Sequence, residues 1–328
     1  MNSFLHIQMD YLLLLQNFRE WSGGIFDSFF THITMGGEYE FGILFTALIY
    51  WIINKNYGIF MIWNLFLGLL TNQFLKVTAC IYRPWILDSR IHPVKIAMQK
   101  AGGYSFPSGH TAIATGTMGA LAKKVWKDKK WLAIFLIVMT LLVAFSRNYL
   151  GVHTPQDVIV SLFIGAGFIF LTGKIINWTQ QGKKRDLIVW GVVMLLCAIL
   201  IIYTELKNYP IDYVNNTILV DPMKMKYESF PKGGFIAGAF TGLLIEKRFI
   251  NFEIPKTILA KIIFYLIGGS ILLYLIHMSG AVVVKNLNNY SSWGRFTSCF
   301  IVSLFLTAIY PAIIKWFYLI KNRFYNDN

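Results

Sequence analysis

The sequence predicts an all-α membrane protein, a polytopic bundle of hydrophobic helices. Hydrophobic residues fill 56% of the 328 positions and charged residues only 14%, whereas soluble domains carry roughly 25% charged residues. Apolar runs recur along the chain, and a run of about 20 residues crosses the hydrocarbon core as a helix. The net charge of +14 predicts no nucleic-acid partner, because the basic residues lie between apolar runs, where they set topology and contact anionic lipid headgroups.

Residues 1–36 predict an extracytoplasmic, interfacial collar ahead of the first span. Residues 4–19 form an amphipathic stretch that is too short, and too interrupted by polar residues such as Asp10, to span the bilayer. This stretch lacks the basic start and the small-residue cleavage site of a signal peptide. Residues 26–33 are expected to continue the same segment along the membrane surface.

Nine later segments are long enough to span, which predicts a core over residues 37–180 and C-terminal helices over residues 181–328 that complete the same membrane domain. The nine are expected near residues 39–53, 57–79, 107–122, 131–150, 154–176, 187–205, 230–245, 257–277 and 296–318. The third and seventh are rich in Gly, Ala and Thr. Small residues let helices approach closely, so these two are predicted to lie inside the bundle.

The distribution of charge predicts the orientation of the chain. With nine spans, 17 of the 30 Lys and Arg residues fall on one side of the membrane with only 5 of the 16 acidic residues. The positive-inside rule makes that side cytoplasmic, with the N-terminus outside and the C-terminus inside. Two outer connections are long, residues 80–106 and 207–228, and the second is a candidate lid or recognition element.

The polar stretch at residues 146–157 (SRNYLGVHTPQD) predicts a nucleophile beside a cation. Thr154-Pro155 is typical of a helix start, and His153 and Asp157, four residues apart, would share one face of the first turn. The carboxylate then fixes the imidazole tautomer and leaves the other ring nitrogen free to attack. An ordinary surface pair is the alternative, but Arg147 supplies the cation that a phosphate needs.

Two further stretches lie on the same predicted side. In residues 107–110 (PSGH), Gly109 lets backbone approach a ligand, Ser108 adds a donor, and His110 is placed to protonate a leaving oxygen. Lys76 and Arg83 lie about two helical turns apart and face one cavity if their helix continues to Tyr82. A capping Ser and snorkelling basic residues are the structural alternatives.

Other patterns carry little chemistry. The three cysteines are widely spaced and predict neither a disulfide framework nor a zinc site, and no nucleotide-binding loop is present. Acidic residues are too sparse near the three stretches for a two-metal phosphatase. Glu205 and Arg295 begin or end predicted outer-side spans and are a candidate ion pair.

The three polar stretches resemble the type 2 phosphatidic acid phosphatase (PAP2) superfamily, whose pattern is K-x6-RP, PSGH and SR-x5-H-x3-D. The chain carries every position of it, in order, over about a quarter of its length. The matching residues are Lys76, Arg83, Pro84, Pro107, Ser108, Gly109, His110, Ser146, Arg147, His153 and Asp157.

This resemblance implies a metal-independent phosphatase that needs no cofactor. His153 would form a phosphohistidine, with Asp157 orienting it, and His110 would protonate the leaving alkoxide and later activate water. The phosphoryl oxygens would be bound by Lys76, Arg83, Ser108, Gly109 and Arg147. Nine spans with an outer N-terminus, an inner C-terminus and an N-terminal collar look like the glucose-6-phosphatase branch.

The function expected from the sequence is therefore hydrolysis of a lipid phosphate monoester or diphosphate at the outer face of a bacterial cytoplasmic membrane. The partners are a phospholipid or other lipid-phosphate substrate and the membrane lipids, with no nucleic acid. One alternative is the same chemistry on a soluble phosphoester such as a sugar phosphate. Others are a vanadate-dependent haloperoxidase, which the spans disfavour, and a non-catalytic lipid-binding protein, which a poised nucleophile disfavours.

Overall fold

The computed structural model describes residues 3–214, 217–285 and 292–326, and these are almost entirely helical. The first part of the chain forms α1 (Ser3–Trp21), α2 (Asp27–Ile33), α3 (Tyr39–Leu48), α4 (Lys55–Ala79), α5 (Pro84–Leu87), α6 (Lys95–Lys100), α7 (Gly109–Ala114), α8 (Ala120–Val125), α9 (Lys130–Tyr149), α10 (Pro155–Gln180) and α11 (Arg185–Leu206). The remainder forms β1 (Tyr213–Val214), β2 (Thr217–Ile218), α12 (Pro222–Ile245), α13 (Ile258–Lys285), α14 (Ser292–Leu304) and α15 (Tyr310–Asn326). The predicted all-α class is confirmed, with one two-stranded antiparallel ribbon added.

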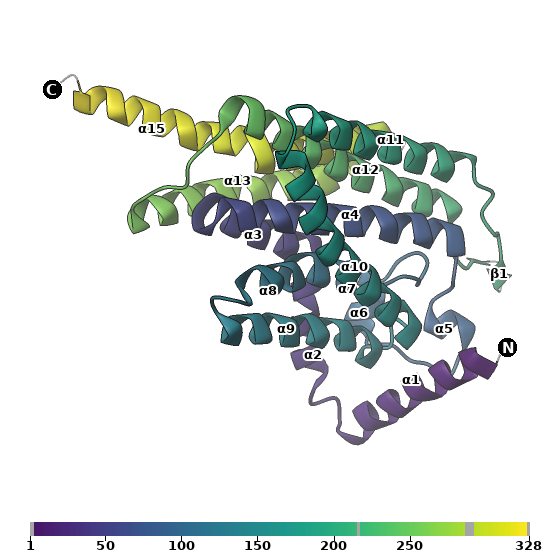
Figure 1. Ribbon diagram of the computed structural model, residues 1–328. Helices are drawn as coiled ribbons and strands as arrows, with labels where there is room; N and C mark the ends of the chain where they lie inside the picture. Colours follow the sequence, from purple (N-terminus) through teal and green to yellow (C-terminus); the bar gives the residue numbers. More distant parts are fainter. Residues whose placement is uncertain (1–2, 215–216, 286–291, 327–328) are drawn as a thin grey trace.

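Helix α4 lies at the centre of the bundle. It packs against α7, α8 and α10 on one side and against α11 and α12 on the other, and α10 runs obliquely across it (Figure 1). Its middle is buried almost all round, as expected of a helix that is apolar on every face and surrounded by other helices. Because α4 carries Lys76 near its C-terminal end, this position fixes one wall of the site described below.

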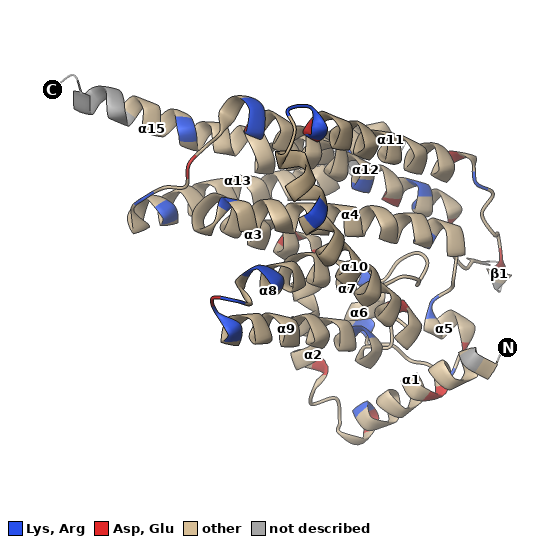
Figure 2. Cartoon of the chain, viewed as in Figure 1, with Lys and Arg blue, Asp and Glu red and all other residues tan. Residues whose placement is uncertain are grey.

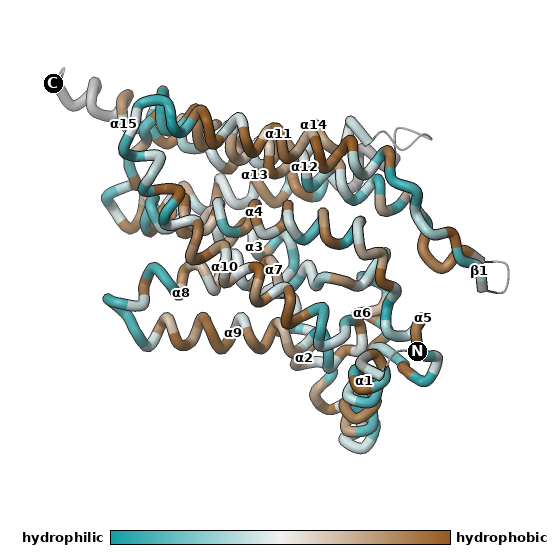
Figure 3. Tube along the Cα trace, turned by 45° about the vertical axis from the view of Figure 1, so that its right-hand side comes forward, coloured by the Kyte–Doolittle hydropathy of each residue, from teal (hydrophilic) through white to brown (hydrophobic). Residues whose placement is uncertain are grey.

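Within the described residues, six helical segments are long and apolar enough to cross a membrane, and the chain is a multi-pass membrane protein. They are Lys55–Leu87, Lys130–Tyr149, Pro155–Gln180, Arg185–Leu206, Ile258–Gly280 and Ser292–Ile320. Their apolar surfaces show as hydrophobic stretches along α9, α11 and α14 (Figure 3), while Lys and Arg gather near helix ends, as at the turn between α8 and α9 (Figure 2). The other three predicted spans correspond to the shorter apolar helix Tyr39–Ile53, to α7 and α8, and to part of α12. The count of nine stays a prediction.

The third and seventh predicted segments lie inside the bundle, as expected from their small residues. A Cβ built at Gly116, in the π turn Thr115–Gly119 between α7 and α8, would lie 2.8 Å from the Cα of Leu65 on α4. One built at Gly234 of α12 would lie 2.1 Å from the carbonyl oxygen of Phe296 on α14. Only glycine permits such approaches, so these helices pack backbone to backbone.

The N-terminal residues form a helical pair, α1 and α2, at the edge of the bundle (Figure 1). Gln16 of α1 fastens this pair to the first long connection: its Nε2 donates to the carbonyl of Arg90 (3.2 Å), and its Oε1 accepts from the amide of His92 (2.7 Å). Large apolar side chains such as Ile7 and Leu14 stay exposed on α1. The predicted amphipathic helix is confirmed; its place at a membrane surface stays a prediction.

The connection at residues 80–106 begins where the predicted span over residues 57–79 ends. Helix α4 ends at Ala79 and does not extend to Tyr82, because Cys80 adopts a left-handed conformation (φ 49°). Pro84 opens α5 at the first helical position, where its missing N–H costs nothing. The chain turns back, and the Ser105 amide donates to the carbonyl of Ile81 (2.7 Å).

The second long connection is shorter than predicted, because residues 222–228 form the first turns of α12. Asp221 caps this helix by accepting a hydrogen bond from the amide of Met223 (2.9 Å). The part before it carries β1 and β2, at the edge of the molecule (Figure 3). Asp212 beside β1 accepts a hydrogen bond from the hydroxyl of Tyr82, which ties the two long connections together. A role as a lid stays a prediction.

Candidate active site

The three polar stretches meet at one cavity of about 560 Å³. Their residues on its wall are Lys76, Arg83, Gly109, His110, Arg147 and His153. They come from α4, α7, α9 and the connections that follow α4 and α9, so the chain brings distant segments to one end of the bundle. Ser108 and Asp157 do not line the cavity but lie behind it, both almost completely buried.

His153 lies just ahead of α10 and is fixed by that helix's start. Thr154 is the N-cap and Pro155 the first helical residue, as predicted. The Thr154 side chain accepts from the amide of Asp157, while the Asp157 carboxylate accepts from the amide of Thr154 (2.9 Å), a complete capping box. The same carboxylate oxygen accepts from Nδ1 of His153 (3.1 Å). This contact orients the ring of His153, which lines the cavity, and leaves Nε2 available as an acceptor.

Two polar side chains that support His153 were not predicted from the sequence. The hydroxyl of Ser105 donates to the Asp157 carboxylate (2.5 Å) and lies 3.4 Å from Nδ1 of His153. Asn148 donates to the carbonyl oxygen of His153 (2.9 Å). Ser105 is fully buried, and its hydroxyl donates to the same carboxylate oxygen that accepts from His153 and from the Thr154 amide. Its place two residues before Pro107 was the only available signal, and serines are common in connections.

Arg83 is held by backbone carbonyls. Its guanidinium donates to the carbonyls of Gly102 (3.0 Å), Gly103 (3.1 Å) and Val152 (2.9 Å), and Nη1 also lies 2.9 Å from Nε2 of His153. Since a guanidinium only donates, Nε2 is the acceptor and carries the ring's lone pair. That agrees with a proton on Nδ1 shared with Asp157.

The other two cations are also buried without a carboxylate. Lys76 donates to the carbonyls of Tyr104 (2.9 Å) and Ser105 (3.2 Å). Arg147 donates through Nη1 to the hydroxyl of Thr34 (2.7 Å), and its buried Nε has no partner among the described residues. No ion pair among the described residues joins Lys76, Arg83 or Arg147 to an Asp or Glu. Buried charge of this kind is costly unless an anion completes it.

The residues of the PSGH stretch have two roles: Ser108 caps α7, and the residues after it line the cavity. Ser108 caps α7 by accepting from the amide (3.4 Å) and the hydroxyl (2.9 Å) of Thr111. A Cβ built at Gly109 would meet nothing within 4 Å, so the space beside it is open. His110 follows as the second residue of α7 and lines the cavity. Ser108 therefore caps α7 in the structure, and its role as a phosphate ligand stays a prediction.

The comparison with known families shows whether the three motifs match the PAP2 pattern by chance or by common descent. The model of the PAP2 superfamily matches residues 57–181, and the model of the PAP2 superfamily phosphatase transmembrane extension matches residues 230–323. The chain belongs to the PAP2 superfamily. The first match contains every predicted site residue, and the second covers most of α12 together with α13 and α14.

Curated relatives match the PAP2 part. The undecaprenyl-diphosphatase of Sulfolobus acidocaldarius is 29% identical over 141 residues, which are 43% of this chain and 65% of that protein. The lipid A 4'-phosphatase of Bacteroides thetaiotaomicron is 27% identical over 152 residues, 42% of this chain and 67% of that protein. The phosphatidylglycerophosphatase B of Escherichia coli is 37% identical over 84 residues, 25% and 32% respectively. The chain thus spans about two thirds or less of these relatives, and no solved structure matches it.

The surroundings of His153 favour the neutral form of its imidazole. His153 lies in the connection between two predicted spans and is only 2% exposed. Burial, reinforced by the positive charges of Arg83, Arg147 and Lys76, lowers the pKa of His153 well below its usual value of 6.5. A neutral imidazole at neutral pH is the form that carries a nucleophilic lone pair.

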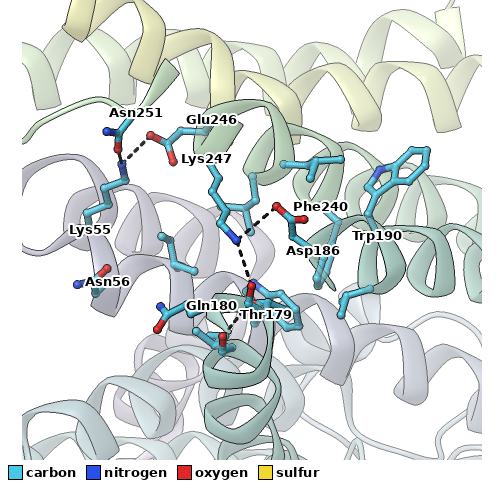
Figure 4. A pocket seen from close by; sticks show the side chains of 16 residues that line it. Lys55, Asn56, Thr179, Gln180, Asp186, Trp190, Phe240, Glu246, Lys247 and Asn251 are labelled. Atoms are coloured by element: carbon cyan, nitrogen blue, oxygen red, sulfur yellow. Dashed lines mark hydrogen bonds and ion pairs between the residues drawn. The ribbon is translucent and has the colours of Figure 1, made fainter. Parts of the chain in front are cut away.

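A second cavity, of about 240 Å³, lies about 30 Å away along α4, near Lys55 at the other end of that helix. Figure 4 shows its polar side chains. Lys55 pairs with the buried carboxylate of Glu246 (2.7 Å), and Lys247 pairs with Asp186 (3.3 Å). Both cations of this cavity already have a carboxylate partner, so it is a structural charge network.

Two remaining expectations concern other polar groups. The predicted pair between Glu205 and Arg295 is wrong: Glu205 pairs with Lys226 (3.4 Å), and Nη1 of Arg295 donates to the carbonyl of Tyr227 (3.4 Å). The reason is that α12 lies between them and offers a nearer cation. Within the described residues, no group of three or more His, Cys, Asp or Glu side chains is placed to hold a metal ion.

Proposed function

We propose that this protein is a membrane phosphatase that hydrolyses a lipid phosphate monoester or diphosphate through a phosphohistidine. The observation that carries the proposal is one cavity lined by His153 and by three cations without carboxylate partners, with Nε2 of His153 as the acceptor of an Arg83 hydrogen bond. An imidazole whose lone pair can be released from such a hydrogen bond is a nucleophile. Cations fixed by backbone carbonyls are preorganised for the charge of a phosphoryl group in its transition state.

The reaction begins when a phosphoryl oxygen takes over the hydrogen bond that Arg83 now gives to Nε2. Nε2 then forms a bond to phosphorus while the bond from phosphorus to the lipid oxygen breaks. His110, in its protonated form, gives its proton to that leaving oxygen. In the second half, His110 removes a proton from water, the water oxygen attacks phosphorus, and the N–P bond breaks to release inorganic phosphate. The scheme needs no metal.

The remaining residues position these groups. Lys76, Arg83 and Arg147 bind the equatorial oxygens, and Gly109 leaves room for the phosphate. Asp157, supported by Ser105, holds the ring of His153 and stabilises its positive charge in the intermediate. Ser108 contributes by capping α7 and so fixing Gly109 and His110.

We further propose that the site faces the outer side of a bacterial cytoplasmic membrane, with the N-terminus outside and the C-terminus inside. Lys76 at the end of α4, His110 at the start of α7 and Arg147 at the end of α9 share one end of the bundle, and the positive-inside count gives the opposite end to the cytoplasm. Residues 1–36 are the collar, 37–180 the catalytic core and 181–328 the helices that complete the domain.

A lipid is the proposed substrate class rather than a soluble phosphoester. A cavity lined by helices of a multi-pass membrane protein suits a substrate whose tail remains in the bilayer. The relatives, named as an undecaprenyl-diphosphatase, a lipid A 4'-phosphatase and a phosphatidylglycerophosphatase B, support the same class.

The test is phosphate release by purified protein in detergent, with lipid phosphates and glucose 6-phosphate as substrates. We expect release from at least one lipid, unchanged by excess EDTA, and an acid-labile phosphoenzyme that His153→Gln abolishes. Release from glucose 6-phosphate alone would transfer the proposal to a soluble substrate. Loss of activity with chelator, or full activity of His153→Gln, would refute the mechanism.

A further inference from the structure

The catalytic cavity has a second polar wall that the reaction scheme does not use. Asn72 of α4, Lys232 of α12 and Arg295 of α14 line the same space as His153 and Arg83. None of the three belongs to the polar stretches singled out from the sequence. Lys232 and Arg295 lie instead in the part matched by the transmembrane extension. The extension therefore contributes directly to the cavity that holds the candidate nucleophile.

Two hydrogen-bond donors on this wall are unpaired. Within the part of the chain that the structure describes, buried Nδ2 of Asn72 and buried Nε of Arg295 have no partner. Asn72 is only 3% exposed and precedes Lys76 by one helical turn, so it lies on the same face of α4. Buried donors are nearly always satisfied in folded proteins, and exceptions at a cavity point to a missing ligand or water.

The cation on this wall is held in place by a hydrogen-bonded chain. Lys232 donates to Oε1 of Gln73, whose Nε2 donates to the hydroxyl of Ser229 (2.7 Å). Glu228 lies 3.6 Å from the Lys232 ammonium and offsets one positive charge. Arg295 has no carboxylate partner among the described residues, so the wall as a whole remains positive.

The second wall adjoins the catalytic cations. Lys232 and Arg295 line the same cavity as Lys76. The first turns of α12 also pack closely against Gly102, whose carbonyl accepts a hydrogen bond from Arg83. A Cβ built at Gly102 would lie 2.2 Å from the ammonium of Lys224. A cavity of about 560 Å³ has the size of sites that hold a whole headgroup, larger than a single phosphate requires.

From this arrangement we propose that Asn72, Lys232 and Arg295 form a second anion subsite, which binds a further phosphate of the lipid headgroup beside the one that is cleaved. The inference rests on the proposed function and narrows its substrate class. The preferred substrate is a lipid with two phosphates in its headgroup, either a diphosphate or a phosphomonoester joined to a phosphodiester. A lipid whose only phosphate is the one removed leaves Nδ2 of Asn72 and Nε of Arg295 without an acceptor, and it does not neutralise the positive charge of this wall.

Two pairs of substrates with matched tails test the subsite: a polyprenyl diphosphate against its monophosphate, and phosphatidylglycerophosphate against phosphatidate. We expect wild-type protein to favour the two-phosphate member of at least one pair. In Arg295→Gln and Lys232→Gln the ratio of kcat/KM within that pair falls about tenfold or more, mainly through KM. Which pair responds identifies the spacing of the two phosphates.

The control is Lys226→Gln, a basic residue on the same helix that pairs with Glu205 and does not line the cavity; its ratios stay at the wild-type values. Arg295→Lys keeps the charge and restores part of the preference, which a merely structural role of Arg295 would not produce. All variants are compared at equal amounts of monodisperse protein. Equal losses on both members of each pair, or unchanged ratios in both variants, overturn the subsite while the phosphatase stands. A wild-type protein that hydrolyses none of the four lipids removes the proposed function and the subsite together.

Discussion

A cavity lies at each end of α4, and both contain buried or partly buried cations. The two cavities differ in the partners of these cations. Near Lys55, each cation lies against a carboxylate, with Glu246 pairing Lys55 and Asp186 pairing Lys247. Near Lys76, three cations, Lys76, Arg83 and Arg147, are held by backbone carbonyls and a hydroxyl, with no carboxylate partner among the described residues. The cavity near Lys76 has more cations on its wall than the cavity near Lys55, and the two also differ in whether the protein neutralises these charges itself.

This difference separates a structural network from a binding site. An ion pair within the protein offsets the desolvation of both partners and leaves little field for a ligand. Cations supported only by neutral acceptors remain charged and rigid, which suits the capture of a phosphate and the stabilisation of its transition state. Cavity size by itself does not make this distinction, whereas the identity of the partners does.

The largest expected effect concerns Asp157. In Asp157→Asn the amide presents an N–H to Nδ1, which favours the wrong tautomer of His153, and we expect kcat to fall by about 10³- to 10⁴-fold. Asp186→Asn removes a carboxylate from the other cavity, and its kcat stays within about twofold of wild type. Steady-state phosphate release measures both, and equal losses would erase the contrast between the two ends.

The next effect compares single cations. Arg147→Gln removes a charge whose one side-chain hydrogen bond within the described residues goes to Thr34, and we expect a loss of about 10²- to 10³-fold in kcat/KM. Lys55→Gln, the matched change at the other end, leaves kcat/KM within about twofold. A full activity of Arg147→Gln would show that the unpaired charge is not used by the substrate.

For thermal stability, the larger effect is expected at the Lys55 end of α4. Glu246 is buried, pairs with Lys55 and accepts from the amide of Phe252 (3.0 Å). Glu246→Gln leaves a partly exposed ammonium without its partner, which costs about 2 kcal/mol of unfolding free energy. We expect a lower midpoint of thermal unfolding in detergent and unchanged kcat per folded molecule. An unchanged midpoint would mean that the pair is not structural.

The smallest effect is a shift in pH dependence. Because burial and nearby cations lower the pKa of His153, the neutral nucleophile persists below pH 6.5, and activity falls only as pH drops through the lowered pKa. Arg83→Gln removes a positive charge, which makes protonation easier and raises that pKa. The acid limb of kcat/KM then moves up by about one pH unit or less, measured on one substrate for both proteins. A limb that stays in place would contradict the assignment of this limb to His153.

Several features of the site follow from local sequence, and for that reason were predicted from it. The contact between His153 and Asp157 depends on a spacing of four residues at the start of a helix that Thr154 and Pro155 specify. The burial of the third and seventh segments follows from their glycines. The left-handed turn at Cys80, which separates Lys76 from Arg83, was not predicted, because such a residue leaves no reliable trace in composition.

The sequence by itself determined the helical membrane class, the order of the three motifs and the superfamily, since these depend on apolar run length and on residues a few positions apart. Only the tertiary structure decided that Ser105 supports Asp157 and that Lys232 and Arg295 share the cavity with His153. Such contacts join residues far apart along the chain, and their partners are set by how helices cross. The physical state of each cation, paired or unpaired, is therefore a property of the packed bundle.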